Sequence, residues 1–176
     1  RPTLKKKTLP FLLIFSALLF LTGCFGEKLP LSELMNRGVS SAVNGDWNAA
    51  LEYAERAIQV APDDVNALIL LALGEENTGD ADAALGTISK ATAVDENNYF
   101  AQYTRGRLLY EKKHFDSCIA PLRTALKLRP TAADPLILLA QSSVNLKDTQ
   151  SAKSYYSQLA RNRKYAKNPA VWSELG

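Results

Sequence analysis

Residues 44–62, NGDWNAALEYAERAIQVAP, determine how the rest of the chain is interpreted. The stretch opens with Asn-Gly-Asp, three residues that favour turns. A run of good helix formers follows and ends at Pro62, which cannot continue a helix. Small side chains lie on one stripe of this predicted helix, at Ala50, Ala54 and Ala57. The stretch therefore predicts a turn followed by a helix that packs closely on a neighbour.

The pattern of small residues returns every 34 residues along the chain. Steps of this length from Gly38 reach Ala72, Gly106 and Ala140. The same steps from Ala50 reach Ala84, Cys118 and Ala152, and from Ala57 they reach Ala91, Ala125 and Leu159. A fixed period of this length indicates a stacked array of repeats. Small residues recur because two antiparallel helices approach closely only where their side chains are small.

These positions resemble the tetratricopeptide repeat, a helix-turn-helix unit of 34 residues. The departures at Cys118 and Leu159 are still apolar, and the family's closing Pro, present at Pro62 and Pro130, is lost at Glu96 and Lys164. The family's opening Trp-x-x-Leu-Gly occurs at Trp172-Ser173-Glu174-Leu175-Gly176. The resemblance implies an all-α fold, a right-handed α-solenoid of antiparallel helix hairpins. The expected repeats are residues 31–64, 65–98, 99–132 and 133–166, and residues 167–176 start a fifth.

The third repeat departs most from the pattern. Its turn is Lys112-Lys113-His114 in place of Gly-Asp, and Pro121 falls inside its second helix. Because proline removes a backbone donor, we expect it to bend or stagger the early turns of that helix.

The first 23 residues have the features of a secretory signal peptide. Three lysines at residues 5–7 precede an apolar run over residues 9–21, which is shorter than the ~20 residues that a membrane span requires. Leu21-Thr22-Gly23-Cys24 then resembles a bacterial lipobox. The resemblance implies cleavage after Gly23 and a diacylglyceryl thioether on Cys24, with further acylation such as palmitate in many such proteins. The alternative is an uncleaved anchor in which Cys24 has no role.

The leader predicts where the protein works. Residues 24–30 would form a lipidated Cys and a short tether that holds the repeats close to the membrane. Phe25 in place of Asp after the Cys resembles outer-membrane sorting in enteric-type bacteria. We therefore expect a lipid-anchored protein of the bacterial cell envelope, on the outer membrane and facing the periplasm.

The charge balance argues against a nucleic-acid partner. The chain holds 21 basic and 18 acidic residues, but the leader carries four of the basic residues and no acidic one. The remainder therefore has 17 basic against 18 acidic residues, and phosphate binding requires clustered positive charge.

The sequence contains no recognisable catalytic or metal-binding motif. His114 is the only histidine and falls in a predicted turn, so one chain cannot form a multi-His metal site. Cys118 occupies a small-residue position and is expected to be an inert core residue. The carboxylate pairs Asp63-Asp64, Glu75-Glu76 and Asp95-Glu96 are expected at turns or solvent faces. We therefore expect a protein that is not an enzyme and has neither cofactor nor metal.

The resemblance also implies a binding surface, because the first helix of each unit lines a concave groove in this family. The candidate groove residues are Asn66, Ile69, Leu73, Phe100, Tyr103, Arg107, Tyr110, Ile137 and Gln141, with Met35, Val39, Glu76 and Val144 at equivalent positions. Tyr and Arg are frequent in binding hot spots, so a peptide or protein partner is expected there. The alternative is that some of these rings pack on the neighbouring helix. The carboxylate clamp of some relatives is not possible, because its places hold Met35, Val39, Leu70, Phe100 and Thr104.

Two functions remain open from the sequence. The first is a lipid-anchored periplasmic scaffold that binds a protein partner during envelope assembly, similar to lipoproteins of pilus secretin assembly or of polysaccharide export. The alternative is the membrane-recruiting module of a larger envelope enzyme, whose catalytic domain would lie beyond Gly176. The full reading frame would separate these hypotheses.

Overall fold

The computed structural model describes residues 28–161, which form eight α-helices and, within this range, no strand. The helices are α2 (Leu31–Val43), α3 (Trp47–Val60), α4 (Val65–Asn77), α5 (Ala81–Val94), α6 (Tyr99–Glu111), α7 (Ile119–Leu128), α8 (Ala133–Asn145) and α9 (Thr149–Arg161). The chain divides into a unit that ends at Pro30 and the helical unit from Leu31 onward. The predicted signal peptide (1–23), its cleavage at Gly23, lipidation at Cys24 and the fifth repeat (167–176) all lie outside the described residues.

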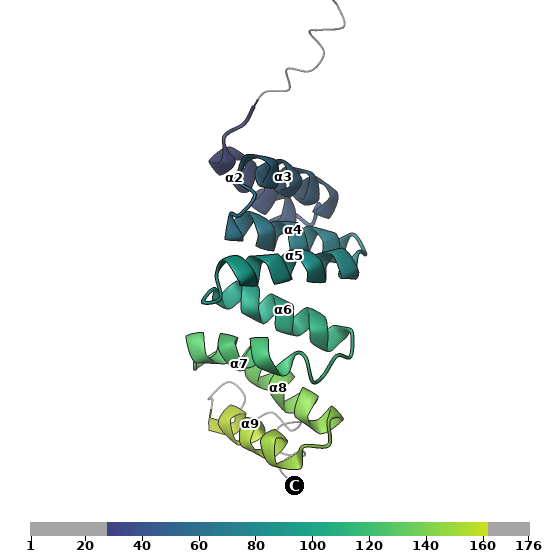
Figure 1. The fold of residues 1–176 in the computed structure, drawn as a ribbon, viewed down its shortest axis with the longest axis vertical. Helices are drawn as coiled ribbons and strands as arrows, with labels where there is room; N and C mark the ends of the chain where they lie inside the picture. The colour runs from purple at the N-terminus through teal and green to yellow at the C-terminus, as the bar shows by residue number, and fades with distance from the viewer. Residues whose placement is uncertain (1–27, 162–176) are drawn as a thin grey trace, which may run out of the picture. The chain divides into compact units, whose positions relative to one another are not determined.

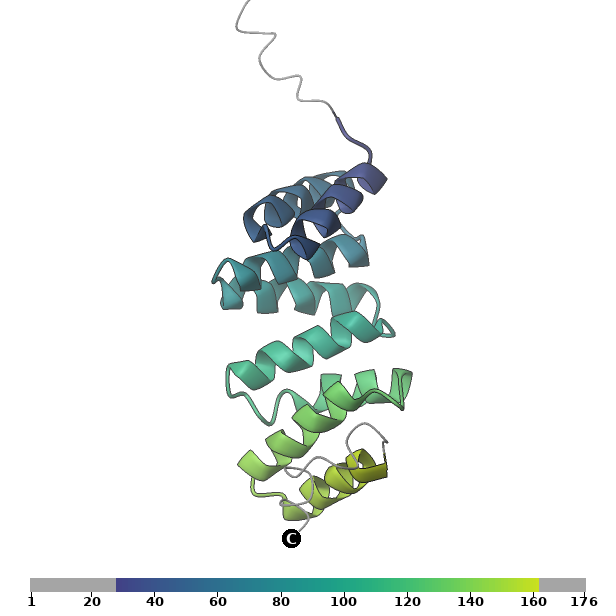
Figure 2. The ribbon, with the colours of Figure 1, turned by 180° about the vertical axis from the view of Figure 1, so that it is seen from behind.

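The helices form four antiparallel hairpins, α2/α3, α4/α5, α6/α7 and α8/α9, which are stacked in chain order (Figures 1 and 2). Each helix contacts the next one along the chain, and the first helices of successive hairpins also contact each other. The described residues are all-helical and stack as hairpins, so the predicted all-α solenoid is confirmed. None of the helices between residues 28 and 161 is long and apolar enough to cross a membrane.

The small residues that define the repeat form the core of the array. The position of Gly38 is buried in all four repeats, and so are the positions of Ala50 and Ala57. Gly106 shows why size matters, because a Cβ placed on it would lie 2.5 Å from Cγ of Leu122 on α7. Cys118 and Leu159, the two departures from the pattern, are fully buried as expected.

Each hairpin turn has the same backbone geometry. The fifteenth residue of every repeat adopts a positive φ, at Gly45 (81°), Gly79 (101°), Lys113 (61°) and Lys147 (60°). Its N–H and that of the next residue donate to the preceding helix in the paired pattern of a Schellman motif, for example Gly45 to Ala42 and Asp46 to Ser41. The second helix then begins at once in three repeats, because Asp46, Asp80 and Asp148 cap its N–H groups.

The third hairpin differs from the prediction. Pro121 does not bend the interior of a long helix, because α7 begins only at Ile119 and Pro121 lies in its first turn. A helix starting at Phe115 would need an N–H on Pro121 to bond to Ser117, and the proline ring would clash with that carbonyl. His114 also replaces the capping aspartate, and the N-cap residue Cys118 makes no side-chain cap. Residues 115–118 therefore form turns, and α7 is the shortest helix of those described.

Candidate binding groove

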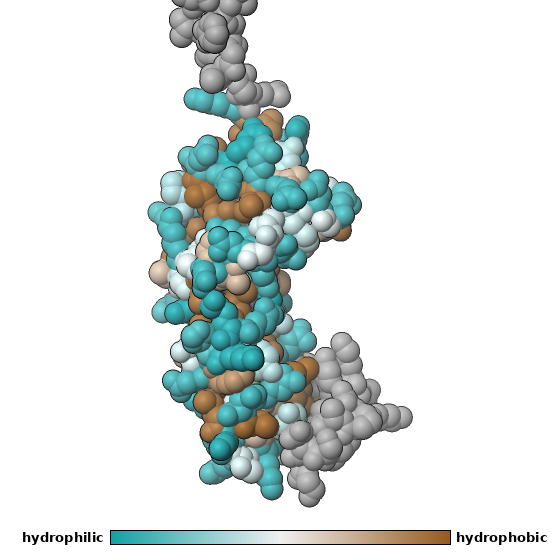
Figure 3. Space-filling model, turned by 90° about the vertical axis from the view of Figure 1, so that its right-hand side faces the viewer, coloured by the Kyte–Doolittle hydropathy of each residue, from teal (hydrophilic) through white to brown (hydrophobic). Residues whose placement is uncertain are grey.

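An apolar hollow lies where the first helices of the first three repeats meet. Its volume is about 280 Å³. The lining residues come from α2, α4 and α6 and are mostly apolar: Met35, Val39, Asn66, Ile69, Leu70, Leu73 and Phe100. All of them except Leu70 stand at predicted groove positions. Figure 3 shows one face of the array, on which apolar surface interrupts the polar surface most broadly near the N-terminal repeats.

Phe100 stands at the edge of this hollow because of how α6 begins. Asn98 caps the helix by accepting a hydrogen bond from the N–H of Ala101, so that Ala101 and Thr104 face the core. The preceding ring then points outward, and 54% of Phe100 remains exposed. Val39 on α2 is 48% exposed. Both side chains offer apolar surface to a partner.

The C-terminal part of the predicted groove is less open. Tyr103, Tyr110 and Ile137 are partly buried and pack against the hydrophobic core of the last two repeats. The ring of Tyr110 also meets the Phe115 ring edge-on, with their centres 5.5 Å apart. Gln141 is half-buried on α8. The rings of Tyr103 and Tyr110 therefore pack mainly on neighbouring helices and offer less surface to a partner than predicted.

The guanidinium of Arg107 forms ion pairs within the protein. Its Nη1 and Nη2 donate to both carboxylate oxygens of Glu76 at 2.5 and 2.6 Å, and Nη1 also donates to Glu111 at 2.7 Å. These bonds, chiefly those to Glu76, raise the pKa of Arg107. Glu76 was expected on a solvent face, but its side chain is only 18% exposed. The pair joins α4 to α6 and occupies the donors that a partner would need.

Arg129, which the sequence analysis did not single out, is the other cation beside the hollow. Its Cζ lies 4.1 Å from the centre of the Tyr99 ring and 4.7 Å from that of Phe100. It is the C-cap residue of α7, and a basic residue there is explained equally well by the helix dipole. No sequence pattern indicates that it meets two rings of another helix.

Glu75 was also expected on a solvent face, yet its Oε2 is buried and has no hydrogen-bond partner among the described residues. This burial raises the pKa of the Glu75 carboxyl, with smaller contributions from the charges of Asp80 and Glu55. Asp64 and Asp95, by contrast, sit at helix ends as expected. Glu75 lies on α4, where a buried carboxylate oxygen without a hydrogen-bond partner costs stability.

A second hollow, of about 330 Å³, lies between α7, α8 and α9. Two of its charged groups, Arg123 and Asp148, already have structural partners. Arg123 donates to the hydroxyl of Tyr155 at 2.9 Å, and Asp148 caps α9. Across residues 28–161, no three His, Cys, Asp or Glu side chains gather as metal ligands would. The buried thiol of Cys118 lies 3.0 Å from Ser142 Oγ, and burial raises its pKa.

Comparisons with known proteins identify the fold. No family model and no curated protein sequence matches the chain. Among solved structures, a MamA protein has a TM-score of 0.75 at 18% identity, covering 86% of this chain and 80% of that one. PilF of Pseudomonas aeruginosa has a TM-score of 0.71 at 22% identity, and the match spans 82% of this chain and 65% of PilF. A tetratricopeptide repeat protein from Parabacteroides merdae has a TM-score of 0.72 at 17% identity, with 85% and 58% covered. The 34-residue pattern, the four hairpins and these likenesses together show that the chain has the tetratricopeptide repeat fold.

Proposed function

We propose that the protein is a lipid-anchored scaffold of the bacterial envelope, which binds a segment of a partner protein in the apolar hollow. The observation that carries this proposal is the hollow itself. The first helix of each of the first three repeats contributes to it. Its edge is formed by two half-exposed side chains, Phe100 and Val39. An apolar concave surface with exposed large side chains is typical of a protein-binding site.

The leader supports the anchor. Lysines, a short apolar run and a Cys directly after Leu-Thr-Gly occur in the order that lipid attachment requires. A lipid with two or more chains holds a protein stably at a membrane, at ~0.8 kcal/mol per buried CH₂. A scaffold held in this way would recruit its partner to the membrane surface, as envelope assembly requires.

The groove is tested with Val39→Glu, which places a carboxylate at the hollow. Burying that charge against an apolar partner side chain is unfavourable, so crosslinked partner should fall to background. The matched control is Val43→Glu on the same helix, because Val43 is 81% exposed and outside the hollow. Partners are captured in cells with a photocrosslinking residue at position 35 and identified by mass spectrometry. Equal yields of the same crosslinked protein from both variants would contradict the groove assignment.

The anchor is tested with Cys24→Ala. Without the thiol no thioether can form, so we expect the protein to stay unprocessed or to leave the membrane fraction, and palmitate labelling to disappear. Cys118→Ser, which changes only the buried thiol, should keep the label. Unchanged fractionation and unchanged mass in Cys24→Ala would show that the chain is not a lipoprotein.

A further inference from the structure

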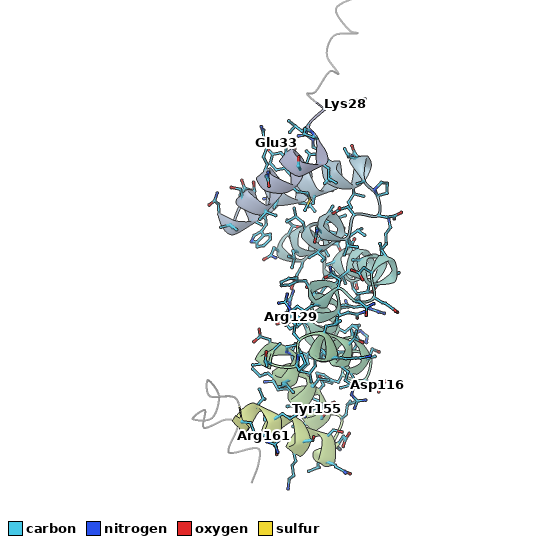
Figure 4. All side chains as sticks on the ribbon, turned by 90° about the vertical axis from the view of Figure 1, so that its left-hand side faces the viewer. Lys28, Glu33, Asp116, Arg129, Tyr155 and Arg161 are labelled. Atoms are coloured by element: carbon cyan, nitrogen blue, oxygen red, sulfur yellow. The ribbon has the colours of Figure 1, made fainter. Side chains whose placement is uncertain are left out.

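Arg129 lies directly beside the apolar hollow, because both share one ring. Phe100 lines the hollow, and the guanidinium carbon of Arg129 is 4.7 Å from the centre of that ring. The cation also covers the Tyr99 ring, which meets Phe100 edge-on at 5.4 Å. Figure 4 shows Arg129 and Asp116 on opposite sides of the array, so this cation is separate from the second hollow, which Asp116 lines.

The donors of Arg129 remain available to a ligand. Arg107, on the same helix as Phe100, has its guanidinium occupied by Glu76 and Glu111. Arg129 has no such partner: among residues 28–161, no carboxylate oxygen lies within 4.0 Å of its side-chain nitrogens, and its side chain makes no hydrogen bond. Rings engage a guanidinium through its face, so that N–H groups in its plane can still bind a carboxylate.

A nearby acidic group of the chain does not occupy Arg129. Burial, and after it the charge of Asp134, raises the pKa of Tyr99 and of Tyr103, yet Asp134 forms no ion pair with Arg129. Contact with two rings restrains the Arg129 side chain before any ligand arrives, which lowers the entropy cost of binding. The rings also displace water, and an ion pair beside them is stronger than one in bulk solvent.

We propose that the segment bound in the hollow carries an acidic side chain that pairs with Arg129, next to an apolar side chain that enters the hollow. This inference rests on the proposed binding function of the groove. Because both contacts involve the one Phe100 ring, the two side chains should lie within about three residues of each other in an extended segment, which advances ~3.3 Å per residue. The partner is thus a protein with an apolar segment flanked by Asp or Glu.

The experiment selects ligands from a phage library of random twelve-residue peptides, using the full chain purified in detergent. Selected peptides should combine an apolar residue with a nearby Asp or Glu. The strongest binder is then synthesised twice, with its acidic residue intact and as Gln or Asn. Affinities of both peptides are measured by fluorescence polarisation for the native chain and for Arg129→Gln. The matched control is Lys127→Gln, which removes an exposed charge two residues earlier on α7.

We expect Arg129→Gln to lower the affinity for the acidic peptide by about tenfold or more, since hydrogen bonds between charged groups are among the stronger ones in proteins. The amide peptide should bind both proteins alike, and Lys127→Gln should leave both affinities nearly unchanged. The difference in affinity between the two peptides for the native chain should decrease at high salt, which screens the ion pair.

Two results would overturn the inference while leaving the groove function intact. Selected peptides could lack an acidic residue, or Arg129→Gln could weaken both peptides equally, with Val39→Glu still abolishing binding in either case. Selection of no peptide, or of peptides that bind Val39→Glu as tightly as the native chain, would instead refute the proposed function together with the inference.

Discussion

The fifteenth residue of each repeat has a left-handed backbone, and its identity sets the cost of the turn. Gly45 and Gly79 adopt this conformation without a steric penalty, whereas Lys113 and Lys147 adopt it at φ near 60°. The left-handed conformation costs a residue with a Cβ about 1–2 kcal/mol in conformational free energy. The third and fourth hairpins therefore store strain that the first two avoid.

Replacing these lysines with glycine should stabilise the protein. For Lys113→Gly and Lys147→Gly we expect a gain of roughly 0.5–1 kcal/mol each, because the strain removed exceeds the extra freedom of glycine in the unfolded chain. Urea denaturation should show a higher midpoint with an unchanged slope. Lys127→Gly, within α7, should lose about 1 kcal/mol. A lower midpoint for both turn variants would rule out strain at this position.

Glu75 gives the molecule a predictable pH dependence. Its folded-state pKa is raised above the ordinary 4.5, chiefly by burial. Below pH 4.5 the carboxyl is protonated in both folded and unfolded chains, and its contribution to stability is fully present. As the pH rises through the folded-state pKa, the unfolded chain releases its proton first, and this stability is lost.

Glu75→Gln should therefore melt at a higher temperature than the native chain at pH 7, because the amide carries no charge to desolvate. The difference should disappear as the pH falls below about 4.5. Melting curves by circular dichroism at several pH values measure both effects. Glu52→Gln, an exposed carboxylate on α3, should change little at any pH. A constant difference across the pH range would show that the benefit is not due to ionisation.

At the scale of the helices, two glycines test close packing in opposite directions. Gly106 on α6 allows Leu122 of α7 to approach, and an added Cβ would lie 2.5 Å from its Cγ and 3.3 Å from its backbone nitrogen. Gly86 on α5 has nothing within 4 Å of such a Cβ. The first glycine is required by a neighbouring helix, and the second is an avoidable cost in helix propensity.

Gly106→Ala should destabilise the protein by roughly 1–3 kcal/mol, because the two helices must separate or repack. Gly86→Ala should stabilise it by about 1 kcal/mol. Thermal unfolding followed at the helical circular dichroism band compares the two variants with the native chain. If Gly106→Ala melted at or above the native temperature, the contact with Leu122 would not constrain the hairpin.

The helix boundaries also show what sequence reasoning captures and where it stops. Turns and caps are local, so the predicted turn at residues 44–46 separates α2 from α3, and α3 ends just before Pro62. In α7, two local effects combine: a missing cap at His114 and a proline at position 121. The sequence analysis noticed both residues but placed the proline inside a bent helix. The structure removes the first turn of that helix instead.

Across the whole array, the 34-residue period predicted the fold and the buried positions, because small residues must recur wherever helices cross. It did not predict that the candidate groove is open at the N-terminal repeats and filled by packed rings further along. Tyr103 and Tyr110 lie at groove positions, yet long side chains reach the adjacent helices and pack there. The contacts of Arg107 with Glu76 and of Arg129 with its two rings join side chains 29 to 31 residues apart, and no helical periodicity specifies such contacts.

The recurrence of turn and cap also makes the chain modular in length. Asp64 caps α4 through the N–H of Ala67, and Asn98 caps α6 in the same way through Ala101. Excision of residues 65–98 would join Asp64 to Tyr99 and place its carboxylate opposite the N–H of Ala101. A gene for such a chain can gain or lose whole units by recombination without a new junction having to evolve, and each event would redraw the groove while keeping the hairpin turns.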